Sequence, residues 1–75
     1  MNWQEYITAD SAVLVGKPVI KGTRLSVEFI LDLMVQGWSE EEILRNYRVQ
    51  REQVRACVAC AQARLSEEKV FSLAA

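Results

Sequence analysis

Residues 39–54 read SEEEILRNYRVQREQV, a stretch that predicts two helices joined by a short turn. Ser39 and Glu42 have the spacing of a capping box, in which the hydroxyl and the carboxylate each bind one backbone N–H group of the first turn. The run of glutamates also suits the positive end of the helix dipole. The predicted segments are a helix over residues 40–46, a turn over 47–50 and a second helix over 51–65.

This pattern is typical of a helix-turn-helix unit. Ile43, Val49 and Val54 supply inward-facing anchors from the first helix, the turn and the second helix. In DNA-binding units of this kind, the first turn of the second helix meets base edges while flanking cations bind phosphates. The candidate DNA-binding residues are therefore Arg48, Gln50, Arg51, Glu52, Gln53 and Arg55.

Other features of the second helix argue against DNA binding. Glutamate repels phosphate, alanine has no group that reads a base, and the formal net charge of −1 adds no general attraction to DNA. Alanines on an outward face suit the close approach of another helix. At about 100° per residue, the expected outward face holds Glu52, Ala56, Ala59 and Ala63, and the expected core face holds Val54, Cys57, Val58, Ala61 and Leu65. DNA binding and protein binding both stay open on these residues.

A further helix is predicted N-terminal to the capping box, where Ser26 is a suitable N-cap and Gly37 a suitable end. Its polar residues recur at every fourth position and form one narrow stripe, and the rest of the helix is apolar. Such a helix must be covered on several sides, which two short neighbouring helices cannot do alone. We therefore expect a homodimer, with interface candidates Val19, Ile20, Leu31, Val35, Val70, Phe71 and Leu73.

Residues 1–25 carry turn signals and short β-prone runs. Tyr6–Thr8, Ala12–Val15 and Pro18–Ile20 are predicted as strands, with Asp10 and Ser11 as a turn pair between the first two. An isolated hairpin is only marginally stable in water. We therefore expect these strands to pair across the dimer.

The last of these strands lies in the segment GKPVIKGTR, residues 16–24, which combines two glycines with three cations. The spacing does not fit a phosphate-binding loop of the G-x-x-x-x-G-K-[ST] type. One interpretation is a strand bounded by two glycine turns, with its cations solvated. The alternative is that Lys17, Lys21, Thr23 and Arg24 contact nucleic-acid phosphate or the carboxylates of a partner.

With 75 residues, the chain is expected to be one domain, with a β arm over 1–25, three helices over 26–66 and a tail over 67–75. Cys57 and Cys60 fall inside a predicted helix, and histidine is absent, so we expect core thiols, no metal, no cofactor and no catalytic site. No apolar run approaches the roughly 18 residues that a membrane span needs. A cytoplasmic protein is expected.

Three motifs follow one another along the chain. They comprise Ile7, Asp10 and residues 16–24; then Val27, Glu28, Ile30 and Leu31; then Gly37, Ser39, residues 41–44 and Tyr47. From Ile7 to about Leu65, the chain resembles a small bacterial family catalogued as domain of unknown function 433. The chain departs from the usual family pattern at Leu14 and Val15, at Arg48 and around Cys60, and none of these departures is expected to break the fold.

The resemblance implies a homeodomain-like, three-helix fold with an N-terminal β arm, often dimeric. It also implies the antitoxin-like half of a toxin–antitoxin pair, beside a small PIN-like ribonuclease. The resulting prediction is a mainly α, small α+β dimer with a helix-turn-helix unit that regulates transcription at operator DNA. The alternative is a dimeric module that binds a protein partner without contacting DNA.

Overall fold

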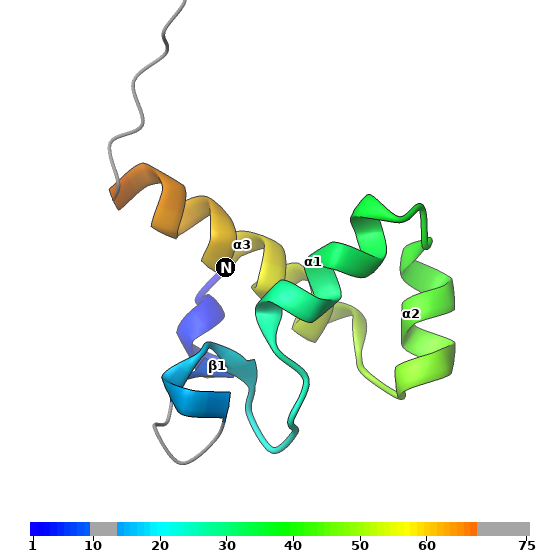
Figure 1. The fold of residues 1–75 in the computed structure, drawn as a ribbon, viewed down its shortest axis with the longest axis horizontal. Helices are drawn as coiled ribbons and strands as arrows, with labels where there is room; N and C mark the ends of the chain where they lie inside the picture. The colour runs from blue at the N-terminus through cyan, green and yellow to red at the C-terminus, as the bar shows by residue number, and fades with distance from the viewer. Residues whose placement is uncertain (10–13, 68–75) are drawn as a thin grey trace, which may run out of the picture.

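The computed structural model describes residues 1–9 and 14–67. Over these residues the chain is mainly α-helical, with one small antiparallel sheet, which confirms the predicted fold class. The elements in chain order are the 3₁₀ helix η1 (Trp3–Glu5), β1 (Ile7–Thr8), the 3₁₀ helix η2 (Leu14–Gly16), β2 (Val19–Ile20), α1 (Val27–Val35), α2 (Glu40–Tyr47) and α3 (Arg51–Glu67). Figure 1 shows α1 crossing α3, with α2 at the end of this pair that lies away from the sheet.

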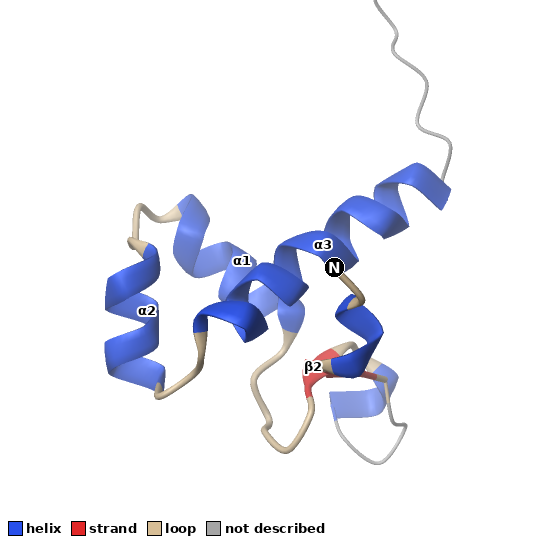
Figure 2. Cartoon of the chain, turned by 180° about the vertical axis from the view of Figure 1, so that it is seen from behind, coloured by secondary structure: helices blue, strands red, loops and turns tan. Residues whose placement is uncertain are grey.

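The two strands pair with each other within a single chain, and their further pairing across a dimer stays a prediction. Ile7 lies opposite Ile20 and Thr8 lies opposite Val19 in an antiparallel register. The hairpin is stabilised because it packs against the helices, and Figure 2 shows the sheet beside α3. Val19 and Ile20 are only 1% and 0% exposed, so these two expected interface residues are core residues of their own chain.

The predicted strand over Ala12–Val15 is wrong at its described end. Leu14–Gly16 forms a 3₁₀ turn, in which Val15 and Gly16 have φ angles of 55° and 78°. Two consecutive left-handed residues cannot continue a strand, and they help to turn the chain toward β2. The part of this prediction that falls on residues 10–13 lies outside the described residues.

Helix α1 begins and ends where the sequence predicts. The Ser26 hydroxyl accepts a hydrogen bond from the Phe29 amide at 2.9 Å. At the other end Gly37 has a φ angle of 98°, and its amide and that of Trp38 donate to carbonyls of the last turn, both at 3.0 Å. This is a Schellman motif, in which a left-handed residue stops the helix.

The core of the three helices is centred on the anchors that the sequence predicts. Ile43, Val49 and Val54 are all buried. The expected faces of α3 are partly wrong, because Ala56 is buried whereas Val58 and Leu65 are 44% and 59% exposed. The physical reason is that η1 and β1 cover one flank of α3 while α1 covers another, so the buried face is rotated.

The expected tail contacts of Val70, Phe71 and Leu73 lie outside the described residues, which end with α3 at Glu67. Within residues 1–9 and 14–67, no helix has the length and apolar character needed to cross a membrane.

Candidate nucleic-acid interface

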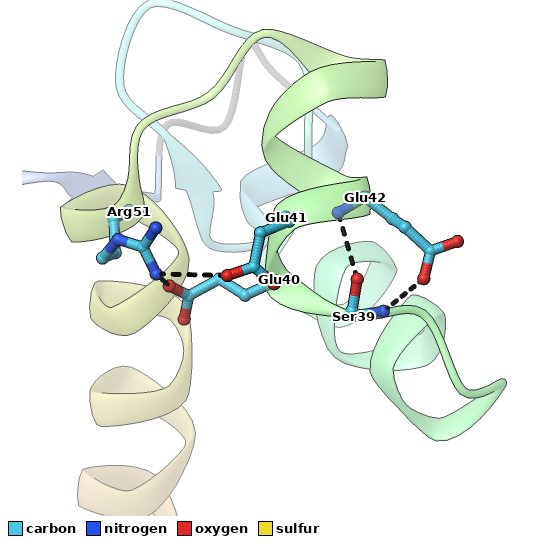
Figure 3. A network of polar contacts seen from close by, with 5 residues as sticks. All are labelled: Ser39, Glu40, Glu41, Glu42 and Arg51. Carbon is cyan, nitrogen blue, oxygen red and sulfur yellow. Dashed lines mark hydrogen bonds and ion pairs between the residues drawn. The ribbon is translucent and has the colours of Figure 1, made fainter.

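The helix-turn-helix unit, Glu40–Glu67, begins with a complete capping box. The Ser39 amide donates to Glu42 Oε1 at 2.9 Å, and the Glu42 amide donates to Ser39 Oγ at 3.2 Å (Figure 3). The hydrogen bond from the Ser39 backbone is the main cause that lowers the pKa of the Glu42 carboxyl from its ordinary value, followed by the bond with the Ser39 side chain. The predicted capping box is confirmed, and it defines the first residue of α2.

The turn between α2 and α3 consists of residues 48–50. Arg48 ends α2 in the left-handed conformation with a φ angle of 55°, which costs about 1 kcal/mol for a residue other than glycine. Val49 is buried, and the packing of its side chain in the core anchors the turn. The turn is therefore held in place by packing that compensates for a strained backbone.

A second capping interaction begins α3. The Gln50 amide donates to Gln53 Oε1 at 2.6 Å, and the carbonyl of Gln50 accepts from the Gln53 amide at 3.0 Å. Gln53, expected to read DNA, is instead engaged in starting its own helix. Gln53 fits the third position of a capping box, but Gln50 is not one of the short polar residues that usually begin a helix, so the sequence carries only half of this signal.

Arg51, expected to contact a base or a phosphate, is held by the acidic first turn of α2. Its guanidinium forms an ion pair with Glu40 and lies 3.9 Å from Glu41 Oε1 (Figure 3). This contact ties the N-terminal ends of α2 and α3 together. The charge of Arg51 is largely compensated inside the unit, so Arg51 offers little attraction to DNA.

Four other arginines of the unit form no ion pair with any described residue, and all four are exposed: Arg45, Arg48, Arg55 and, in the last turns of α3, Arg64. Arg45 lies in the last turn of α2, one turn before Arg48, whereas the acidic residues of α2 lie in its first turn. The positive and negative charges of α2 are therefore separated along its axis. The sequence prediction missed Arg45, although its spacing of three from Arg48 indicates the same end of α2.

Gln50 and Glu52 are also exposed at the start of α3. Their side chains form no hydrogen bond with the residues that the structure describes. The candidate interface, which we call the arginine surface, comprises Arg45, Arg48, Gln50, Glu52 and Arg55. It keeps most of the predicted DNA-binding residues, loses Arg51 and Gln53, and gains Arg45.

The second predicted set lies on the loop that joins β2 to α1. The Thr23 hydroxyl donates to the Ile20 carbonyl at 2.8 Å and accepts from the Leu25 amide at 3.0 Å, so it stabilises the turn rather than facing a ligand. Lys17 forms an exposed ion pair with Glu28 at 3.5 Å. Lys21 and Arg24 are exposed and remain available to a ligand.

The two cysteines are core residues, as the sequence predicts. Both side chains are buried, and burial is the main cause that raises the pKa of the Cys57 thiol to about 12, with the neighbouring Cys60 adding to it. A thiol that stays protonated at neutral pH is a poor nucleophile and a poor metal ligand. Among residues 1–9 and 14–67, no group of three or more His, Cys, Asp or Glu side chains is arranged to hold a metal ion.

The fold and the arginine surface together define a small, mainly α-helical protein built around a helix-turn-helix unit. Comparison with known families gives a match over residues 7–61 to the family described as Protein of unknown function (DUF433), and the chain belongs to this family. No curated protein matches the chain, and no solved structure does. The resemblance seen in the sequence motifs is thereby confirmed.

Proposed function

We propose that this protein is an antitoxin-like regulator whose helix-turn-helix unit binds operator DNA. The observation that carries the proposal is the separation of charge within the unit. Glu40 and Glu41 lie beside Arg51, whereas Arg45, Arg48 and Arg55 are exposed and form no ion pair with the described residues. Exposed arginines near the start of the second helix, without an ion pair to the described residues, are what contact with a phosphate backbone requires.

Each residue of the arginine surface has a role under this proposal. The three arginines bind phosphates and position the unit on the duplex. Gln50 and Glu52 face the major groove from the first turn of α3, where glutamine pairs with adenine and glutamate accepts from the amino group of cytosine. Glu52 weakens general attraction to DNA, and for this reason it favours sites that present a suitable base over random sequence.

A formal net charge of −1 makes the affinity of a single copy low. Two copies bound to adjacent half-sites give the regulator its affinity, as in other dimeric helix-turn-helix proteins. The family resemblance extends the proposal to a protein partner, a small PIN-like ribonuclease toxin that the regulator neutralises. We place the regulator and this toxin in the cytoplasm.

The direct test is titration of a labelled duplex from the upstream region of the gene, beginning at low salt. We expect saturable binding by the wild-type protein and none by a variant with Arg45, Arg48 and Arg55 all replaced by alanine. Arg51→Ala is the matched control, because it removes one arginine of the same unit whose charge is already compensated. Absence of wild-type binding at low salt would refute the proposal.

The second candidate function is a module that binds a protein partner without DNA. An aromatic cluster at the junction of α1 and α2 favours it. The ring centroids of Phe29 and Tyr47 are 5.3 Å apart in an edge-to-face arrangement, and those of Trp38 and Tyr47 are 5.9 Å apart. Phe29 is exposed and the other two rings are half-buried. Partly exposed tryptophan and tyrosine often dominate the energetics of protein interfaces.

Co-expression with the proposed ribonuclease toxin separates the two candidates. If the protein acts only by binding its partner, the triple alanine variant protects cells as well as wild type, and Phe29→Ala does not. If it acts as a regulator, the triple variant loses control of its own promoter while Phe29→Ala keeps it.

A further inference from the structure

An apolar groove lies between the first turns of α1 and the last turns of α3. Its volume is about 420 Å³, which is within the size range of pockets that take a small ligand or several side chains. Val27 and Leu31 line it from α1, and Ala61 and Leu65 line it from α3. Leu65 is 59% exposed, so the groove leaves a large apolar side chain in contact with solvent.

The rim of the groove is positively charged. Lys17, Glu28 and Arg64 all border it. Lys17 and Glu28 pair with each other at 3.5 Å, whereas Arg64 forms no ion pair with the described residues. An occupant that complements this groove therefore carries a carboxylate next to a short run of apolar side chains.

The chain itself contains such a segment. Residues 68–75 read EKVFSLAA, in which Glu68 comes two positions before the first of the apolar residues Val70, Phe71 and Leu73, with Lys69 between. The segment therefore supplies both the carboxylate and the apolar side chains that complement the groove. This segment continues directly from α3, whose last turns line the groove.

Occupation of the groove by the segment of the same chain is disfavoured by the sequence. To lie back along α3, the chain would have to reverse direction immediately after Glu67. Reversal at a helix end normally uses a left-handed glycine or asparagine, as at Gly37 in this protein. Residues 66–75 contain no glycine, asparagine or proline. A second copy is therefore the source of the segment that fits.

We propose that residues 68–75 of one copy dock in the groove of a second copy, and that the exchange is reciprocal. Val70, Phe71 and Leu73 cover the apolar floor, and Glu68 pairs with Arg64 of the other copy. The groove lies toward the C-terminal end of α3, and α2 lies at the other end of the helix pair (Figure 1). The arginine surface stays accessible. The inference deepens the proposed function, since it describes how two DNA-binding copies are joined.

The first test measures the mass of the full chain by sedimentation at micromolar concentration, without DNA. We expect wild type to have the mass of two copies of 8.5 kDa. Phe71→Asp and Leu31→Asp should each weaken association at least about tenfold, the change expected when one large apolar side chain is no longer buried. Val58→Asp is the matched control, because Val58 is an exposed apolar residue of α3 outside the groove.

Mixing the two weakened variants tests whether the segment crosses between copies. A mixed dimer keeps one intact pair, formed by the groove of Phe71→Asp and the segment of Leu31→Asp. We therefore expect tighter association in the mixture than in either variant alone. Two variants that remain single copies when mixed would overturn the proposal, and so would an unchanged mass for Phe71→Asp.

Exchanging the charges of Arg64 and Glu68 distinguishes a lost ion pair from misfolding, because only a lost ion pair can be restored by the second change. Arg64→Glu changes an exposed side chain and should weaken association, whereas adding Glu68→Arg should restore it. Failure of the second change to restore association would overturn the pairing of these residues. Because these measurements contain no DNA, failure here is distinguishable from failure of the proposed function, which the duplex titration tests separately.

Discussion

The arginine surface makes a quantitative prediction about the salt dependence of DNA binding. Each phosphate neutralised by a cation releases counterions, so the logarithm of the binding constant falls with the logarithm of salt by about 0.9 per contact. The structure offers Arg45, Arg48 and Arg55 as contacts and removes Arg51, which Glu40 already compensates. Three contacts give a slope of about −2.7 per bound copy.

The slope sets the size of the effect. Between about 50 and 200 mM salt, a slope of −2.7 weakens binding by a factor of about 40 per copy. Arg48→Ala removes one contact and should reduce the slope to about −1.8. Alanine and arginine are similarly strained in the left-handed conformation of residue 48, so the change alters charge with little effect on the turn.

The assay is fluorescence anisotropy of a labelled duplex at several salt concentrations, with wild type, Arg48→Ala and Arg51→Ala compared side by side. Arg51→Ala should leave the slope near the wild-type value. Equal reductions in the two variants would refute the idea that the acidic turn of α2 compensates Arg51. An unchanged slope in Arg48→Ala would show that the arginine surface does not face phosphate.

Four further predictions concern stability and reactivity. Ser39→Ala should lower the free energy of unfolding by about 1 kcal/mol. Carboxyl NMR titration of that variant should show the pKa of Glu42 rising toward its ordinary value. In the wild-type protein, the stabilisation from the Glu42 carboxylate is complete at pH values above the ordinary pKa. It is lost as the pH falls through the lowered pKa of the folded state. The Cys57 thiol, whose pKa is raised to about 12, should react with a thiol reagent only after denaturant unfolds the chain, and rapid labelling of the native protein would contradict its burial. Gly37→Ala should cost about 1 kcal/mol from backbone strain alone, because an added Cβ meets no atom within 4 Å. Arg48→Gly should add about 1 kcal/mol of stability while weakening DNA binding, and chemical denaturation measures both changes in stability.

Local signals in the sequence predict the helices well. Ser26, Ser39 and Gly37 identify two helix starts and one helix end, because capping depends on hydrogen bonds between residues only a few positions apart. Ile43, Val49 and Val54 identify the core for a similar reason, since their spacing follows from helical geometry and one short turn. The family match over residues 7–61 spans all of these signals.

Predictions that depended on contacts between distant segments were less successful. Ala56 was expected to face outward, but it is buried, since η1 and β1 as well as α1 pack against α3. Val19 and Ile20 were expected to meet a second copy, but the chain buries them in its own hairpin. Helical periodicity locates the faces of a helix and cannot say how many neighbours cover them.

The predictions about the candidate site show the same difference between local signals and contacts across the fold. The sequence alone determined that a capped helix, a turn and a second helix carry a cluster of arginines, because each of these features is encoded within a few residues. Only the tertiary structure decided which arginines are available, since the ion pair between Arg51 and Glu40 joins residues eleven positions apart across the turn. Charge compensation depends on distance in space, and the packing of α2 against α3 sets that distance.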